Sequence, residues 1–276
     1  MNNLRLVTDN AADSATLTAS SEAGSLVVGN LKSNIKAKVW RSTGTTATLT
    51  AVFASALIAG CVALPFCSLS ASAYIRVRAY SNSADIVPAY DSGTVLAVKS
   101  PALGSWAWGA LPLGVNSYAY GGAAYTVQWI PIGAYQKIVI DLEDTLNPLG
   151  YIEASRLVIG PYWEAAINPD WGADAGVNDT TTNARTESGD LLSDIGVQYR
   201  SVNLSFSEMN PADRATLWNI IRKSGLSRPM LLSVFPNHTD TNLEQEAQIF
   251  GKFSQLNPFG YKVLDVFTQS ISFEEI

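Results

Sequence analysis

The residues of this chain that are best suited to chemistry are one histidine, two cysteines and a few clustered carboxylates. His238 lies in the turn sequence Pro-Asn-His-Thr-Asp, and it would have to be the base of any Ser-His-Asp triad. No Gly-x-Ser-x-Gly nucleophile elbow accompanies it. A solvated loop histidine is the simpler interpretation. The sequence therefore predicts no catalytic residue and no enzyme.

The two cysteines, Cys61 and Cys67, lie in one apolar stretch at a spacing that fits neither a Cys-x-x-Cys motif nor a zinc pattern. One histidine and two close cysteines also leave a conventional zinc site short of ligands. We expect two buried thiols, with a local disulfide as the alternative. No metal site and no cofactor are predicted.

Two groups of carboxylates are the remaining candidates for chemistry: Asp141, Glu143 and Asp144 follow a predicted strand, and Asp190 and Asp194 lie in a polar loop. Paired carboxylates hydrolyse glycosides when a fold holds them at the right separation. The same groups could bind a structural calcium ion, although no Asp-x-Asp-x-Asp-Gly spacing is present. Asp141 and Glu143 alternate with apolar neighbours, so a solvated strand face also explains them.

Aromatic side chains give a stronger functional signal, because seven of them lie between residues 106 and 135 among many glycines. Aromatic rings stack on sugars, anchor protein interfaces or fill a core, and all three interpretations stay open. At a spacing of two residues, Trp106 and Trp108 would project from one side of a strand. The candidate sugar or interface contacts are Trp106, Trp108, Tyr118 and Tyr120.

The composition limits the classes of partner. The net charge is −6, only 15% of the residues are charged, and no basic run occurs. Proteins that bind nucleic acid need clustered Lys and Arg to neutralise phosphates, so no direct nucleic-acid partner is expected. The most apolar stretch, residues 51–65, is interrupted by Ser55, Gly60 and Pro65, and a span needs about 20 mainly apolar residues. No membrane span is predicted.

The first half of the chain has the pattern of many short strands separated by turn residues. Thr46–Phe53 alternates Thr with Ala, Leu and Val, and Tyr74–Tyr80 alternates so that Arg76 and Arg78 share one face. Further strands are predicted at residues 4–7, 25–28, 137–142 and 151–159. Such a series favours a β-sandwich or jelly roll.

The second half begins with a polar stretch and continues with a strand–helix–strand unit from Arg200 to Phe235. Asn210 is suited to cap a helix over residues 211–224, and Gly225 is suited to end it. Leu217, Trp218 and Ile221 are expected to cover a sheet. Two further strands are predicted near residues 247–254 and 263–273.

Several stretches resemble tail-tip proteins of long-tailed bacteriophages. Asn34–Thr50, with Trp40-Arg41-Ser42, resembles the opening strands of galactose-binding-like jelly-roll modules in such proteins. Residues 80–90 and 151–164 continue this likeness. Residues 186–189, 199–206 and 225–235, the helix with Trp218 and the closing strands resemble distal-tail and minor-tail proteins that share the tail-tube fold.

The resemblance implies a mainly β protein with a jelly-roll module over residues 1–163, a long loop or arm over 164–195, and a tail-tube-like β domain with one helix over 196–276. It implies a structural component of a phage tail tip or baseplate. The chain would form or join a homo-oligomeric ring, a hexamer or trimer, between tail tube and hub or fibres. It would be made in the cytoplasm of the bacterial host and be located in the virion.

Two alternatives to this function stay open. A carbohydrate-binding module for host-surface recognition is compatible with the aromatic cluster, and a polysaccharide hydrolase would use the carboxylates. The resemblance itself favours assembly. A heterologous ring interface joins two different faces of each subunit, and we expect residues 168–190 to lie across a neighbouring subunit.

Overall fold

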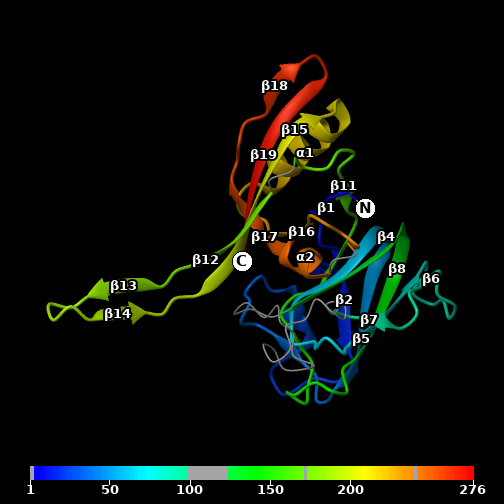
Figure 1. Cartoon of the computed structure of the whole chain (residues 1–276). Helices are drawn as coiled ribbons and strands as arrows, with labels where there is room; N and C mark the ends of the chain where they lie inside the picture. The colour runs from blue at the N-terminus through cyan, green and yellow to red at the C-terminus, as the bar shows by residue number, and fades with distance from the viewer. Residues whose placement is uncertain (1–2, 99–123, 171–172, 239–240) are drawn as a thin grey trace.

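The computed structural model describes residues 3–98, 124–170, 173–238 and 241–276. Most of these residues lie in β-strands, which confirms the predicted mainly β class. The strands form a nine-stranded sheet folded into a sandwich, an eight-stranded sheet that carries the long helix, and a projecting two-stranded ribbon (Figure 1).

Two long antiparallel strands build the sandwich, β4 (Thr46–Cys67) and β8 (Ala124–Glu143). Their pairing register shifts at three places, and such irregularities bend and twist a strand. The first half of β4 also pairs β2, whereas its second half also pairs β10 and β9. The two long strands therefore run through both layers of the sandwich. The predicted strand over residues 46–53 is the first third of β4.

Strand β5 (Tyr74–Tyr80) flanks β8, and its bounds match the predicted strand. Ile75 and Val77 are buried, and Arg76 and Arg78 face outward as expected. Short elements complete this part of the chain: η1 (Ala11–Asp13), β2 (Thr16–Ala19), η2 (Val28–Lys32), β3 (Trp40–Arg41), β6 (Tyr90–Asp91), β7 (Val95–Leu96), β9 (Glu153–Ala154) and β10 (Val158–Gly160).

The eight-stranded sheet combines the two ends of the chain. Strand β1 (Arg5–Val7) lies between β11 (Trp163–Glu164) and β16 (Met230–Ser233). The sheet continues from β16 through β17 (Gln248–Gln255), β19 (Val266–Glu275), β15 (Gln198–Met209) and β12 (Asp174–Asp179), with β18 (Gly260–Val263) paired to β19. Residues 5–7 thus pair outside the sandwich, while the proposed domain limits at 163 and 195 stay a prediction.

The helix α1 (Pro211–Ser224) has the predicted bounds and caps. The backbone N–H of Asp213 donates to the side chain of Asn210 at 2.7 Å, and Gly225 has a positive φ of 52°. Leu217 is fully buried, but Trp218 is 53% exposed and packs at a tilt on Phe259, with ring centroids 5.5 Å apart. The prediction that Trp218 covers the sheet is therefore wrong.

Residues 174–197, called the arm here, form β12, a connection, and the ribbon of β13 (Thr182–Arg185) and β14 (Leu191–Asp194). In Figure 1 the ribbon extends away from the rest of the molecule. β13 and β14 pair with each other and with no other described strand. The stretch predicted as a loop or arm, residues 164–195, thus contains the strands β12, β13 and β14.

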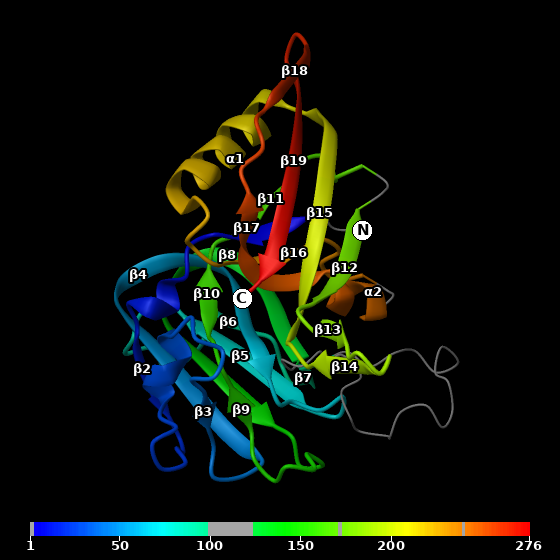
Figure 2. The same ribbon diagram turned by 90° about the vertical axis from the view of Figure 1, so that its left-hand side faces the viewer.

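A buried interface joins the sandwich to the eight-stranded sheet. Phe66 and Tyr125 of the sandwich pack against Phe250 of β17, and all three side chains are at most 4% exposed. The Tyr125 hydroxyl donates to Glu275 at 2.7 Å, and Glu275 also accepts from Arg200 at 2.7 Å. Apolar packing and the hydrogen bonds of the Tyr125 hydroxyl therefore join the two sheets, whereas the Arg200–Glu275 ion pair links β15 and β19 within the eight-stranded sheet. Figure 2 shows this junction at mid-height.

Other local predictions had mixed outcomes. Residues 25–28 form no strand but run from a turn through the isolated bridge residue Leu26 to the start of η2, and residues 151–159 are broken between β9 and β10. The short helix α2 (Thr241–Glu246) was not predicted. The apolar stretch 51–65 is part of β4, and no helix in the described part of the chain is long and apolar enough to cross a membrane.

Candidate functional site

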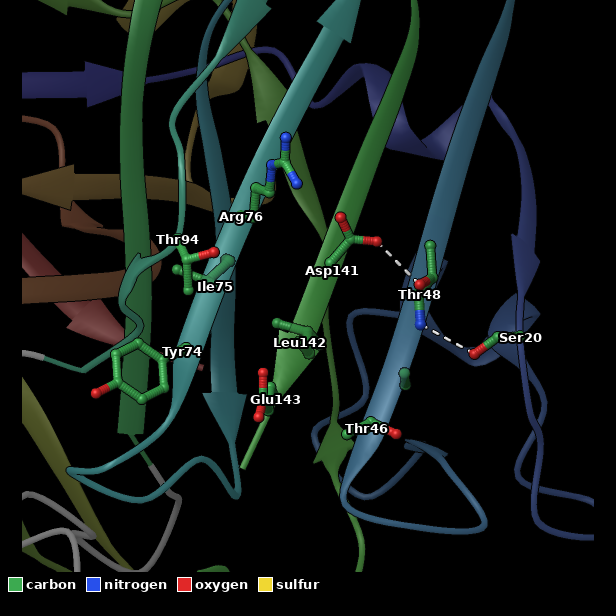
Figure 3. Close-up of a pocket in the computed structure, with 11 residues that line it drawn as sticks. Ser20, Thr46, Thr48, Tyr74, Ile75, Arg76, Thr94, Asp141, Leu142 and Glu143 are labelled. Atoms are coloured by element: carbon green, nitrogen blue, oxygen red, sulfur yellow. Dashed lines mark hydrogen bonds between the residues drawn. The ribbon is translucent and has the colours of Figure 1, made fainter. Parts of the chain in front are cut away.

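A polar groove lies on the outer face of the sandwich, across β4, β8 and β5 (Figure 3). Strand pairing builds it in two rows. Glu143 lies between Thr46 on β4 and Tyr74 on β5, and the next row places Asp141 at the centre. The groove has a volume of about 330 Å³ and is open to solvent. Side chains alternate along a strand, so the apolar neighbours of these polar residues face the core.

Asp141 is held by two side chains of the neighbouring strands. It accepts a hydrogen bond from the Thr48 hydroxyl at 2.9 Å and forms an ion pair with Arg78 at 2.7 Å. Arg76 pairs instead with Asp91 through both ends of its guanidinium, and this hydrogen bonding lowers the pKa of Asp91 to about 2. The central carboxylate is therefore held in position by side chains from both neighbouring strands.

Glu143 and Tyr74 supply the accessible groups of the groove. The side chain of Glu143 is exposed and makes no hydrogen bond or ion pair with any described residue, and Tyr74 is 44% exposed. Figure 3 shows both side chains at the same end of the groove. A carboxylate, several hydroxyls and an aromatic face are the groups that bind the hydroxyls and apolar faces of a sugar.

The sequence singled out Asp141 and Glu143 but not Tyr74, Thr46 or Thr48. The alternation of the two strands contained part of the signal, because it places Asp141 and Glu143 on one face of β8 and Arg76 and Arg78 on one face of β5; the pairing of Arg76 with Asp141 puts these on the same face of the sheet. Which strands are neighbours, and in what register, was not available from the sequence. Asp190 and Asp194 lie in the arm, away from the groove.

His238, Cys61 and Cys67 lie apart from the carboxylates of the polar groove. His238 does not line the polar groove but an apolar cavity of about 380 Å³ beside α2, where its ring packs on Phe235 at 5.9 Å between centroids. No group of three or more His, Cys, Asp or Glu among the described residues could hold a metal ion. Cys61 and Cys67 are buried and not bonded to each other.

The predicted contacts Trp106, Trp108, Tyr118 and Tyr120 lie outside the described residues. The other members of the aromatic cluster are packed inside the protein. Tyr125 and Tyr135 are at most 5% exposed, and Trp129 packs edgewise on Tyr162 at 5.2 Å and beneath Arg5 at 4.9 Å. These three aromatic residues therefore serve packing.

The arm is the second candidate for a binding surface. Leu191 and Leu192 are 57% and 60% exposed, and Ile195 and Val197 beyond them are 86% and 72% exposed. Neighbouring strand residues point to opposite faces, so Leu191 and Leu192 expose apolar side chains on both faces of the ribbon. So many exposed apolar side chains on one projecting element make the arm a candidate interaction surface.

Comparisons with known proteins add little about function. No protein-family model and no curated protein sequence matches the chain. Solved structures similar to part of it include the family 32 carbohydrate-binding module from C. perfringens NanJ in complex with galactose, with 12% identity, coverage of 58% of this chain and 99% of that one, and a TM-score of 0.36. A chitosan-binding module from Paenibacillus sp. IK-5 is 12% identical, with coverage of 55% and 99% and a TM-score of 0.38.

The lectin domain of lectinolysin in complex with Lewis B antigen is similar at 12% identity, with coverage of 58% and 99% and a TM-score of 0.37. TM-scores of this size do not indicate that this chain binds what those modules bind. The resemblance to phage tail-tip proteins has no support among these matches.

Proposed function

We propose that this chain is a non-catalytic structural subunit that joins neighbouring subunits through its arm. The observation that carries the proposal is the exposed apolar β-ribbon of β13 and β14. An isolated two-stranded hairpin is only marginally stable in water. A partner that covers the ribbon would bury its leucines and stabilise its ladder, at about 1.5–3 kcal/mol for each fully buried leucine.

The sequence resemblance suggests where such an assembly belongs. Our finer proposal is a ring component in the tail tip or baseplate of a long-tailed phage, between tail tube and hub or fibres, made in the host cytoplasm and located in the virion. The low charge of the chain and its projecting arm are compatible with this role. The buried junction between sandwich and sheet would let the chain act as one rigid subunit.

Shortening the arm tests the proposal. Residues 180–197 are replaced by Asn-Gly, which suits a two-residue turn between the paired residues Asp179 and Gln198. We expect a folded chain with a melting temperature close to that of the unaltered protein, because the removed residues are mostly exposed. Sedimentation and native mass spectrometry should show an oligomer for the unaltered chain and a monomer for the shortened one.

The control alters apolar exposure elsewhere. Ile86 and Val87 are 92% and 79% exposed in a loop of the sandwich, and Ile86→Ser with Val87→Ser should leave the oligomer intact. An unaltered chain that stays monomeric at high concentration, or a shortened chain that still assembles, would exclude the arm as the joining element.

The polar groove favours a second candidate function, carbohydrate binding by the sandwich. The supporting observation is that accessible Glu143, Tyr74 and three threonines line one open groove. On a glycan array, Tyr74→Ala and Glu143→Gln should each reduce binding at least about tenfold, which corresponds to losing about 1.4 kcal/mol. Thr50→Ala, one row further along β4, is the matched control. Binding by none of the proteins would reject this candidate.

A further inference from the structure

A second exposed apolar surface lies at the end of the molecule formed by α1 and the β18–β19 hairpin. Tyr261, Val263 and Leu264 are 75%, 64% and 89% exposed at the hairpin tip, and Trp218 of α1 is exposed beside them. We call this surface the head, meaning the outer face of α1 together with residues 260–265. Figures 1 and 2 both show the hairpin projecting beyond α1 at the top of the molecule.

Ring contacts make the head one structural unit. Trp218 packs on Phe259 at 5.5 Å, and Tyr261 packs on Phe267 at 5.3 Å between ring centroids. The Arg214 guanidinium lies 4.9 Å from the Phe267 ring. The helix therefore supports the hairpin, and the exposed apolar groups of both elements form a surface on a firm base.

The head and the arm carry opposite charge. Arg222 and Lys262 are exposed on the head and form no ion pair with any described residue, and Asp265 is the one carboxylate at the hairpin tip. The arm has a single basic residue, Arg185, among five carboxylates: Asp174, Asp179, Glu187, Asp190 and Asp194. All five carboxylates are exposed. The apolar side chains of the arm are thus flanked by acidic residues, and those of the head are flanked by basic residues, so the two surfaces are complementary in charge.

We propose that the arm of one copy of this chain docks on the head of the next copy. The inference rests on the proposed assembly function and names the acceptor surface. Burial of one face of the ribbon, which carries either Leu191 or Leu192, against Trp218, Tyr261 and Leu264 would supply affinity. The charges would select the partner and orient it, because exposed ion pairs add little affinity but opposite potentials steer association.

The occupant is a second copy rather than the same chain. The ribbon extends away from the molecule while the head lies at its upper end, so an arm reaches a head only on another molecule (Figure 1). Two different faces then meet at each contact, which makes the interface heterologous. Contacts of this type propagate from copy to copy into a closed ring or an open filament.

Paired charge reversals give a sharp test. The arm variant carries Asp190→Lys and Asp194→Lys, and the head variant carries Arg222→Glu and Lys262→Glu. All four positions are exposed, so both variants should melt near the temperature of the unaltered protein. In each variant alone, the ribbon and the head that meet at the contact carry charge of the same sign. We expect each to associate at least about tenfold more weakly in sedimentation equilibrium.

The mixture decides the proposal. In a one-to-one mixture the ribbon of the first variant, with three basic residues and one carboxylate, meets the acidic head of the second, and the acidic arm of the second meets the basic head of the first. Association should therefore return to nearly the unaltered strength, in alternating assemblies. A mixture no stronger than either variant alone would overturn the arm-to-head contact.

The outcome is separable from that of the shortened arm. If shortening the arm abolishes assembly but the mixture shows no rescue, the arm joins subunits through a surface other than the head, and this inference fails alone. If shortening the arm changes nothing, the proposed function fails as well. The matched control Lys252→Glu alters a basic residue of β17 outside the head and should not weaken association.

Discussion

The residues that matter most for holding this molecule together form a buried polar cluster between its two sheets. Glu275 accepts from Arg200 and from the Tyr125 hydroxyl, which itself accepts from the Phe250 backbone at 3.1 Å. Glu275→Gln removes the charge that compensates Arg200, and breaking a buried pair costs about 3–5 kcal/mol. We expect this loss in chemical denaturation. Glu274→Gln, on the exposed side of the same strand, is the control.

The same cluster predicts a dependence of stability on pH. Burial raises the pKa of Glu275, but the Arg200 charge and the hydrogen bonds from Arg200 and Tyr125 outweigh it, so the pKa is lower than usual. A carboxyl with a lowered folded-state pKa stabilises the fold above its unfolded pKa of about 4.3, and this contribution is lost as pH falls through the folded-state pKa. Melting temperatures from pH 6 to about pH 3 should fall less in Glu275→Gln than in the unaltered chain.

The two cysteines lead to a prediction about reactivity. Burial raises the pKa of Cys67 to about 12 and that of Cys61 further still, and the thiolate is the reactive form. Both thiols are at most 1% exposed. A thiol reagent at pH 8 should therefore label the native protein far more slowly than the unfolded protein. Rapid labelling of either cysteine without denaturant would show that β4 opens locally.

At the scale of elements, the cap of α1 can be tested in isolation. Asn210→Ala removes the side-chain acceptor for the Asp213 N–H, and loss of such a cap costs about 1 kcal/mol. Urea denaturation should show a lower midpoint with an unchanged slope. Asn219→Ala, on the exposed face of the same helix, should stabilise slightly or leave the midpoint unchanged, because alanine favours helix and no contact is lost. Equal losses in both variants would contradict a capping role.

Elements governed by local chemistry were predictable from sequence, whereas elements governed by distant pairing were not. The helix over residues 211–224 was predicted because its apolar spacing lies within it and its caps lie directly beside it. The exposure of Trp218 was not predicted from the sequence. It depends on where the hairpin of residues 260–275 lies, and that hairpin is distant in the sequence. The place of β1 between β11 and β16 depends on pairing across more than 150 residues.

The candidate sites show the same division. Alternation predicted that Asp141 and Glu143 share a solvated face, but the register that places Tyr74 and Thr46 beside Glu143 required the structure. The arm was predicted as an irregular polar segment because both of its faces are exposed. Without a buried face the sequence lacks the regular alternation by which strands are recognised.

The whole molecule is expected to unfold as one unit, because the junction between sandwich and sheet is as well buried as either core. Phe250 is 1% exposed between Phe66 and Tyr125, and β1 anchors the start of the chain in the eight-stranded sheet. Calorimetry of the unaltered chain should therefore show a single transition, with calorimetric and van't Hoff enthalpies in agreement.

Weakening the junction alone should separate the two parts. Phe250→Ala removes the ring that the sandwich packs on, at a cost of about 3–5 kcal/mol, and most of this loss falls on the coupling between the sheets. We expect two resolved transitions or a van't Hoff enthalpy well below the calorimetric one. Phe253→Ala is the matched control, because Phe253 lies in the same strand but packs on Phe273 within the eight-stranded sheet. That variant should lower the melting temperature of a single transition, and splitting in both variants would mean that the sheets fold independently of the junction.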